Sequence, residues 1–177
     1  RYVSVTGVQT CALPILAVQT YNGYTGENMT VVLAKALLYT HFNKKAEELA
    51  LEDYKPGDKL IPFKVVGEYK GPDLVGMEYE QLIPWVKPVT VDENGKWQEA
   101  AGEAFRVIPG DYVTTEDGTG IVHIAPTFGA DDAFVARAAG IPSLFMINKK
   151  GETRPMVDLT GKFYLLDELD EAFVKEC

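Results

Sequence analysis

One segment, residues 118–132 with the sequence GTGIVHIAPTFGADD, restricts the fold more than any other part of the chain. Two glycines around a threonine predict a tight turn. The next five residues, IVHIA, are mostly apolar, as in a buried strand, and Pro126 ends the run. Two adjacent aspartates then stand where a helix begins, at the positive end of its dipole. The segment therefore predicts a turn, a strand and a helix start in immediate succession.

Short apolar runs of the same kind recur along the chain and predict many short strands. We expect strands at residues 17–20, 30–34, 63–69, 73–79, 105–108, 111–115 and 143–148. A turn rich in glycine and asparagine joins the first two. Helices are expected at residues 35–42, 130–139 and 167–176, and the polar residues 88–104 are expected to form a surface insertion. We therefore predict a strand-rich α+β fold, a distorted β-barrel with short helices.

The composition excludes several broad classes of protein. With 46% hydrophobic and 24% charged residues, the chain is globular in composition. Its net charge of -9 argues against a stand-alone nucleic-acid binder, although such a domain can receive the tip of a nucleic acid that is held elsewhere. The two cysteines, Cys11 and Cys177, give neither a disulfide framework nor a zinc spacing. No apolar run approaches the roughly 18 residues that span a membrane, so we expect a cytoplasmic protein without membrane contact.

His123 and Asp132 are the residues of the segment with the most chemistry to offer. They can meet at the end of one strand, where a histidine relays a proton and an ionised aspartate holds an ammonium group. The plainer interpretations are a hydrogen-bonded core histidine and, for Asp131 and Asp132, a helix N-terminus. A metal site built from His123, Asp131 and Asp132 is a third alternative, with few ligands. His41 is expected to be an exposed surface residue.

Taken as a whole, GTGIVHIAPTFGADD resembles the signature of the editing domain of isoleucyl-tRNA synthetases, which are class I aminoacyl-tRNA synthetases. The related valyl and leucyl enzymes share the GTG start, the proline and an aspartate at the position of Asp132, but not the VHxAPxFGxDD form. Flanking pieces of the same domain resemble YNGYTGENMTVVLAKALL, KVVGEYKGPDLVGMEYEQLIPW and FMINKKGETRPMVDLTGKFY. The resemblance covers roughly residues 17–177 and implies a partial editing domain.

The resemblance also implies what such a domain does. It implies a strand-rich barrel, inserted in an isoleucine–tRNA ligase, that hydrolyses valine mischarged on isoleucine tRNA without a metal or other cofactor. ATP and Mg belong to the intact synthetase, outside these residues. Asp132 is expected to bind the α-amino group of the misattached amino acid, and His123 to line the pocket, as the catalytic pair. The expected partners are the 3′ end of isoleucine tRNA and the remainder of the synthetase chain.

Further residues of the segment are implied to surround the substrate. Gly118, Thr119 and Gly120 are expected to shape the turn beneath it. Asp131 is included in the substrate-binding set, with capping of the helix as its expected role. All of these residues are therefore candidates for the site.

A second half of the family's site is not found in this sequence. In the family, a threonine-rich strand written TTTPWT precedes the first matched segment, and the nucleotide motifs HIGH and KMSKS are missing here as well. We therefore expect the isolated chain neither to activate isoleucine nor to edit efficiently. The main alternative is a catalytically incomplete module that binds the tRNA acceptor end, and a metal-dependent hydrolase is a third hypothesis.

The first residues of the chain have a different character. The string VTGVQTCALPI, residues 5–15, matches letter for letter the in-frame translation of a common sequencing-library adapter. A signal peptide is the rival interpretation, but no charged region precedes the apolar run, which is too short. We therefore expect residues 1–16 to be a translated adapter that packs poorly and is not part of the domain, and residues 17–177 to be the partial editing domain.

Overall fold

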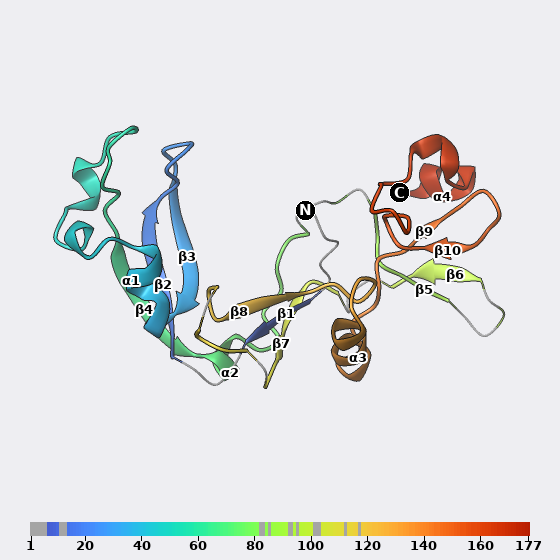
Figure 1. Cartoon of the computed structure of the whole chain (residues 1–177), viewed down its shortest axis with the longest axis horizontal. Coiled ribbons are helices and arrows are strands. Elements are labelled where there is room, and N and C mark those ends of the chain that lie inside the picture. Colours follow the sequence, from blue (N-terminus) through green and yellow to red (C-terminus); the bar gives the residue numbers. More distant parts are fainter. Residues whose placement is uncertain are drawn as a thin grey trace. The chain divides into compact units, whose positions relative to one another are not determined.

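The computed structural model describes residues 7–10, 14–81, 84, 86–91, 94, 96–100, 104–111, 113–116 and 118–177. Groups of short strands are separated by short helices along the chain (Figure 1). The strands are β1 (Gly7–Thr10), β2 (Pro14–Tyr21), β3 (Asn28–Ala34), β4 (Lys64–Lys70), β5 (Val89–Val91), β6 (Trp97–Glu99), β7 (Arg106–Pro109), β8 (Ile121–Ile124), β9 (Met146–Ile147) and β10 (Thr153–Arg154). The α-helices are α1 (Leu38–His41), α2 (Gly71–Leu74), α3 (Ala130–Ala138) and α4 (Glu171–Glu176), and the 3₁₀ turns are η1 (Lys35–Leu37), η2 (Lys44–Ala46), η3 (Leu51–Asp53) and η4 (Leu166–Glu168). The predicted strand-rich α+β class is confirmed.

The chain divides into two compact units, which are described separately. Unit 1 comprises residues 1–8, 76–108 and 123–177, and unit 2 comprises residues 9–75 and 109–122. The segment at residues 118–132 therefore contributes to both units, with its glycine turn in unit 2 and His123 and Asp132 in unit 1.

Unit 2 is built on an antiparallel sheet in which β2 lies between β3 and β4. The β2–β3 hairpin is the one that the sequence predicts, and its apolar, β-branched residues explain why it forms. In its turn, the side chain of Asn22 accepts hydrogen bonds from the backbone amides of Tyr24 and Thr25, which fixes the reversal locally. The other edge of β2 pairs with β4, with an irregularity between Ala17 and Val18.

The core of unit 2 joins this sheet to the residues that follow β3. Phe63, just before β4, is 1% exposed, and its ring centroid lies 4.7 Å from that of Phe42. Leu38 of α1 is buried in the same core. The buried members of this core are Leu16, Val18, Leu33, Leu38, Ala46 and Phe63. The core therefore fixes α1 against the sheet.

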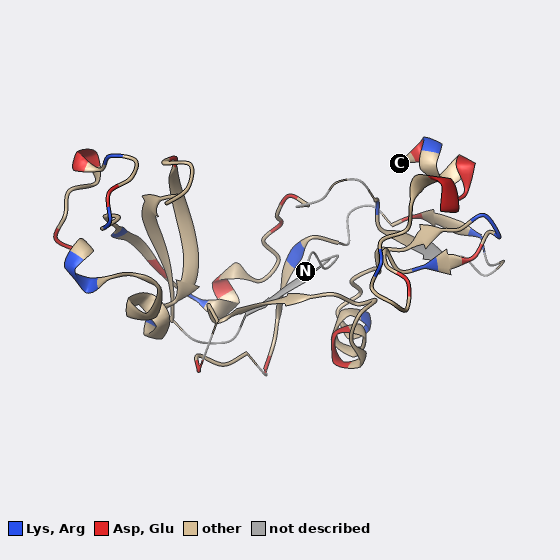
Figure 2. Cartoon of the chain, turned by 45° about the horizontal axis from the view of Figure 1, so that its top comes forward, with Lys and Arg blue, Asp and Glu red and all other residues tan. Residues whose placement is uncertain are grey.

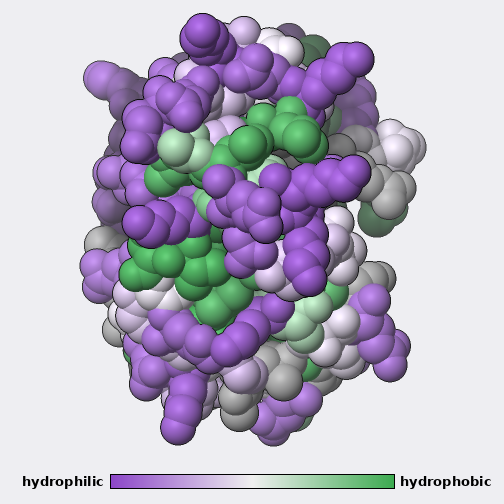
Figure 3. Space-filling view, turned by 90° about the vertical axis from the view of Figure 1, so that its left-hand side faces the viewer, coloured by the Kyte–Doolittle hydropathy of each residue, from purple (hydrophilic) through white to green (hydrophobic). Residues whose placement is uncertain are grey.

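The surface of unit 2 mixes apolar and polar side chains. Figure 3 views the molecule from the side on which β2, β3 and β4 lie in Figure 1. It shows apolar patches interrupted by polar side chains. Val66 and Tyr69 of β4 are among the exposed apolar residues. Scattered apolar side chains are usual on protein surfaces, and we assign these no binding role.

Unit 1 contains two apolar clusters. One gathers residues from the β5, β9 and α4 regions, namely Val86, Val89, Met146, Ile147, Met156, Leu169 and Phe173. The other consists of Ile108, Ile124, Ala136 and Ile141, and it packs α3 against the end of β8. Two hairpins, β5–β6 and β9–β10, complete the unit. The chain also forms a small sheet with the strand order β7-β1-β8. Acidic side chains are concentrated in η4 and α4 near the C-terminus (Figure 2).

Three predicted elements of the chain are wrong. No strand is found among the described residues of the predicted strand 111–115. Residues 73–79 were expected to form a strand, but α2 occupies their start. Pro72 favours a first helical turn, and the Asp73 carboxylate accepts a hydrogen bond from the Lys70 amide at 2.8 Å. Residues 88–104 were expected to be a surface insertion, yet β5 and β6 pair within them, and Val89 is 3% exposed. Trp97 of β6 packs edge-on against Phe173, so β6 lies against the apolar cluster of unit 1.

Two further elements are shorter than predicted. The strand expected at residues 143–148 is reduced to β9. The helix expected at residues 167–176 is divided into η4 and α4, because Asp170 caps α4 by accepting a hydrogen bond from the Phe173 amide at 2.9 Å.

The structure describes only part of residues 1–16. Residues 1–6 and 11–13 lie outside the described residues, so the expected poor packing stays a prediction there. Strand β2 begins at Pro14 rather than at Ala17, and Ile15 and Leu16 are buried. The expected poor packing is therefore wrong for Ile15 and Leu16, and the strand begins three residues earlier than predicted. The origin of residues 1–16 stays a prediction. Closure of the sheets into a barrel also stays a prediction.

Candidate functional site at the end of strand β8

Strand β8 carries His123 to the surface of unit 1. Ile124 is 0% exposed and anchors the strand in the cluster beneath α3. His123, its neighbour, is exposed, and so is Val122 before it. The interpretation of His123 as a core histidine is therefore wrong, and its ring is accessible from solvent.

Asp132 lies in the first turn of α3 and is tied to the end of β8. Its Oδ2 atom accepts a hydrogen bond from the backbone amide of Ala125 at 2.9 Å, in a part-buried position. Gly129 is the N-cap residue of α3, so the carboxylate of Asp132 links two elements and does not cap the helix. Among the described residues, no hydrogen bond is found to its other oxygen, Oδ1.

The neighbouring candidates differ from Asp132 in their surroundings. Asp131 is exposed in the first turn of α3, where its charge faces the positive end of the helix dipole, and it is not the cap. Among the described residues, no hydrogen bond joins His123 to Asp132. The residues that the structure describes contain no group of three or more His, Cys, Asp and Glu side chains that could hold a metal ion.

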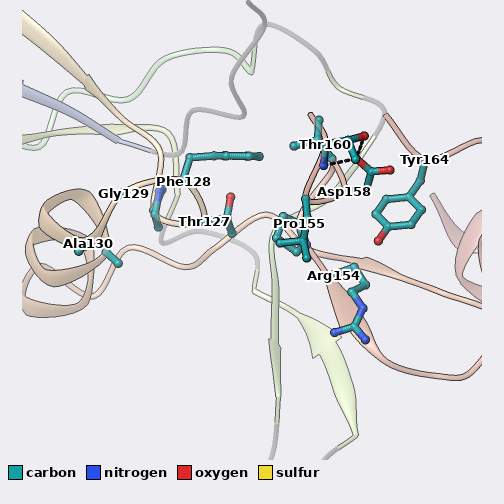
Figure 4. A pocket seen from close by; sticks show the side chains of 13 residues that line it. Thr127, Phe128, Gly129, Ala130, Arg154, Pro155, Asp158, Thr160 and Tyr164 are labelled. Carbon is teal, nitrogen blue, oxygen red and sulfur yellow. Dashed lines mark hydrogen bonds between the residues drawn. The ribbon is translucent and has the colours of Figure 1, made fainter. Parts of the chain in front are cut away.

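A pocket of about 1000 Å³ opens in unit 1 directly after β8. One wall is Pro126, Thr127, Phe128, Gly129, Ala130 and Ala133, and the other is Arg154, Pro155, Val157, Asp158, Leu159, Thr160 and Tyr164. Figure 4 shows Phe128 and Thr127 on the first wall, and Pro155 and the polar ends of Arg154 and Tyr164 on the second. Asp132 lies between two lining residues of α3, but neither it nor His123 lines this pocket. The sequence did not predict the second wall. Its residues lie in the piece FMINKKGETRPMVDLTGKFY, which resembles the family but in which no residue was assigned a role.

The second wall includes a turn that Asp158 stabilises. Its Oδ1 atom accepts hydrogen bonds from the Thr160 hydroxyl at 2.6 Å, the Thr160 amide at 2.8 Å and the Lys162 amide at 3.0 Å. The hydroxyl of Thr160, and then the two amides, hold the pKa of Asp158 below its usual value of 3.8. The turn is therefore held by a charged carboxylate at neutral pH.

This arrangement predicts that acid loosens the turn. Because the folded pKa of Asp158 is lowered, its stabilising contribution is complete above 3.8 and is lost as the pH falls through the folded pKa. Replacing Thr160 by Val removes the largest cause and should raise this pKa toward 3.8. An NMR titration of the Asp158 carboxyl carbon measures both values. A wild-type pKa at or above 3.8, or no rise in T160V, would contradict the assignment.

In unit 2, the glycine turn before β8 is fitted closely to the end of β3. The Ala34 amide donates a hydrogen bond to the Thr119 carbonyl at 2.7 Å. Gly120 has a φ of 74°, and a Cβ atom built on it would lie 2.5 Å from the Cβ atom of Ala34. Gly118 has a similar φ of 69°, but nothing lies within 4 Å of a Cβ atom there. Gly120 is therefore required both by its positive φ and by its closeness to Ala34, whereas Gly118 is required by its positive φ alone.

These two glycines give a matched pair of variants. Gly118→Ala should lose about 1–2 kcal/mol of unfolding free energy, because alanine is strained in the left-handed region. Gly120→Ala should lose about 1–3 kcal/mol more, because its methyl group also overlaps Ala34. Denaturant unfolding of the two variants measures the difference. Equal losses would show that the contact with Ala34 is not close.

None of the helices that the structure describes combines the length and the apolarity that crossing a lipid bilayer requires.

Comparisons with known proteins give the chain a family. No family model matches it. It is 83% identical over 162 residues to an isoleucine–tRNA ligase of Bacteroides thetaiotaomicron, a match that covers 92% of this chain and 14% of the relative. The isoleucine–tRNA ligase of Porphyromonas gingivalis is 55% identical over 163 residues, covering 91% of this chain and 13% of that enzyme.

One solved structure is also similar. It is described as GlLeuRS-CP1, with a TM-score of 0.42 and 14% identity over 87% of this chain and 50% of that one. The curated relatives are much longer than this chain, which spans about 14% of the first of them. By its sequence, the chain belongs to the isoleucyl-tRNA synthetases, as a segment of such an enzyme.

Proposed function

We propose that these residues form part of an editing site that, in the intact synthetase, hydrolyses valine wrongly attached to isoleucine tRNA. The observation that carries the proposal is Asp132, which is held at the end of β8 by the Ala125 amide and flanked by Ala130 and Ala133 of the pocket wall. One missing methylene changes binding in an apolar pocket by only about 1–3 kcal/mol, a limit for which isoleucyl-tRNA synthetases are the standard example. A second, hydrolytic site overcomes that limit.

The chemistry assigned to Asp132 is recognition of the α-ammonium group. The Ala125 amide orients the carboxylate through Oδ2, and Oδ1 is the atom that we assign to the substrate. A hydrogen bond between two charged groups in a part-buried position is about twice as strong as a neutral one. With the amino acid so held, water attacks the ester carbonyl carbon and the bond to the ribose oxygen breaks. That oxygen takes up a proton, and free valine and deacylated tRNA leave.

The other candidates act around this anchor. His123, exposed on β8, is proposed to line the site and to position water or the terminal adenosine. Gly118, Thr119 and Gly120 shape the turn that precedes β8, and Asp131 adds negative charge to the first turn of α3. We assign no metal or cofactor to these residues. ATP and Mg²⁺ are proposed to serve aminoacylation elsewhere in the synthetase.

The proposed partners are the 3′ end of isoleucine tRNA and the rest of the synthetase chain. A net charge of -9 repels the phosphates of the tRNA body, so other parts of the enzyme must bind it. We further propose that the threonine-rich strand of the family completes both the site and the distorted barrel. The proposed location is the cytoplasm.

Segment exchange tests the proposal. The 162 matched residues would replace their counterpart in the Bacteroides thetaiotaomicron enzyme, where 83% identity favours correct folding. The exchanged enzyme should hydrolyse valyl-tRNA at least about tenfold faster than isoleucyl-tRNA, because the missing methylene decides entry. The isolated chain should hydrolyse neither ester efficiently. Equal rates for the two esters in the exchanged enzyme would contradict the proposal, and binding of the acceptor end without hydrolysis would favour the binding module.

A further inference from the structure

The last residue of α1 reaches the glycine turn of unit 2. The ring atom Nε2 of His41 lies 2.5 Å from the carbonyl oxygen of Gly118, which is 77 residues away in the sequence. A carbonyl oxygen only accepts hydrogen bonds, so Nε2 carries the proton and donates it. His41 is exposed, as predicted, yet it makes a specific contact that the sequence does not indicate.

This contact is one of several that fix the turn to residues 34–41. His41 binds the Gly118 carbonyl, the Ala34 amide binds the Thr119 carbonyl, and Gly120 lies against the methyl group of Ala34. The two holding residues belong to a continuous stretch that runs from the end of β3 through η1 to α1. Leu37 and Leu38 within that stretch are 4% and 6% exposed, so the core of unit 2 makes it rigid.

We propose that His41 is a positioning residue, which holds the turn at Gly118, Thr119 and Gly120 and so sets where β8 begins. The proposal rests on the proposed function, because this turn leads along the chain directly into β8, the strand that carries His123. The ring is exposed and contributes little to the core, so its loss should disturb the turn far more than the overall stability. Loss of a residue with a purely structural role would lower the overall stability more than it disturbs the turn.

Hydrogen exchange in the full chain tests the clamp without any activity measurement. The probe is the Ala34 amide, because it donates to the Thr119 carbonyl. In His41→Ala, its exchange should be about tenfold faster, with the unfolding midpoint shifted by only a few degrees. His41→Gln should restore protection, because its amide nitrogen reaches the same place as Nε2 and carries a proton.

Tyr39→Ala is the matched control, since Tyr39 is exposed on the same helix and its hydroxyl binds Glu47 instead of the turn. Its Ala34 amide should exchange as in the wild type. Unchanged exchange in His41→Ala, or a Gln variant that behaves like Ala, would overturn the clamp.

The exchanged synthetase tests the consequence for editing. His41→Ala should lower kcat for valyl-tRNA hydrolysis about tenfold with KM changed less than about twofold, and His41→Gln should recover most of the rate. An active exchanged enzyme in which His41→Ala leaves kcat unchanged would overturn the positioning role. An exchanged enzyme that is inactive with His41 in place would instead refute the proposed function, and the exchange of the Ala34 amide would still decide the clamp.

Discussion

Replacing Asp132 by Asn should slow hydrolysis of valyl-tRNA by the exchanged synthetase about 10- to 150-fold, the equivalent of one hydrogen bond to a charged group. Asparagine keeps an oxygen that can accept the 2.9 Å hydrogen bond from the Ala125 amide, so the end of β8 should stay in place. What is lost is the negative charge that we propose holds the α-ammonium group. The rate of release of labelled valine from preformed valyl-tRNA measures the effect.

Asp131→Asn is the matched comparison for this variant. It removes the same charge from the same turn of α3, but Asp131 is exposed and is not tied to β8. Its effect should therefore be much smaller than that of Asp132→Asn. Equal losses would point to the general charge of the helix start, or to a joint metal site, in place of a specific contact with the substrate.

Replacing Phe63 by Ala should remove about 3–5 kcal/mol of the stability of unit 2, the largest structural effect that we expect. Phe63 is 1% exposed, and its ring packs against Phe42 in the core that also holds Leu38 of α1. Deleting the ring leaves a cavity between the sheet and the stretch that clamps the glycine turn. Amide exchange within β2 and β3 should become about 10²- to 10⁴-fold faster.

The control for Phe63 is Tyr24, at the tip of the β2–β3 turn. Its side chain is fully exposed, so Tyr24→Ala should change stability by less than about 0.5 kcal/mol. A loss of under 1 kcal/mol in Phe63→Ala would contradict a shared core that holds the sheet and α1 together.

Local sequence patterns predict the elements whose stability is itself local. The β2–β3 hairpin and α3 were predicted, because each combines an apolar pattern with its own turn or helix-start residues. Residues 73–79 show the limit of this reasoning. Their apolar pattern suits a strand, but the bond between the Lys70 amide and the Asp73 carboxylate starts a helix instead. A side chain that forms a hydrogen bond with a nearby backbone amide can thus favour a helix where the apolar pattern predicts a strand.

Contacts between distant residues explain what the sequence could not predict. The polar residues 88–104 include a hairpin in which Trp97 meets Phe173, and no local signal announces that contact. Within the candidate site, the resemblance identified Asp132 and His123, whereas the bond from the Ala125 amide and the second pocket wall emerge only from the folded loops. The same holds for His41, whose partner is 77 residues away.

The central claim is that Asp132 binds the α-ammonium group of the misattached amino acid, and one measurement tests it most directly. The exchanged synthetase and its Asp132→Asn variant would each be titrated calorimetrically with a non-hydrolysable valyl-adenosine analogue and with the same compound lacking its amino group. We expect removal of the amino group to weaken binding to the wild type at least about tenfold more than to the variant, since the two groups interact directly. The same loss of affinity in both proteins would contradict the claim.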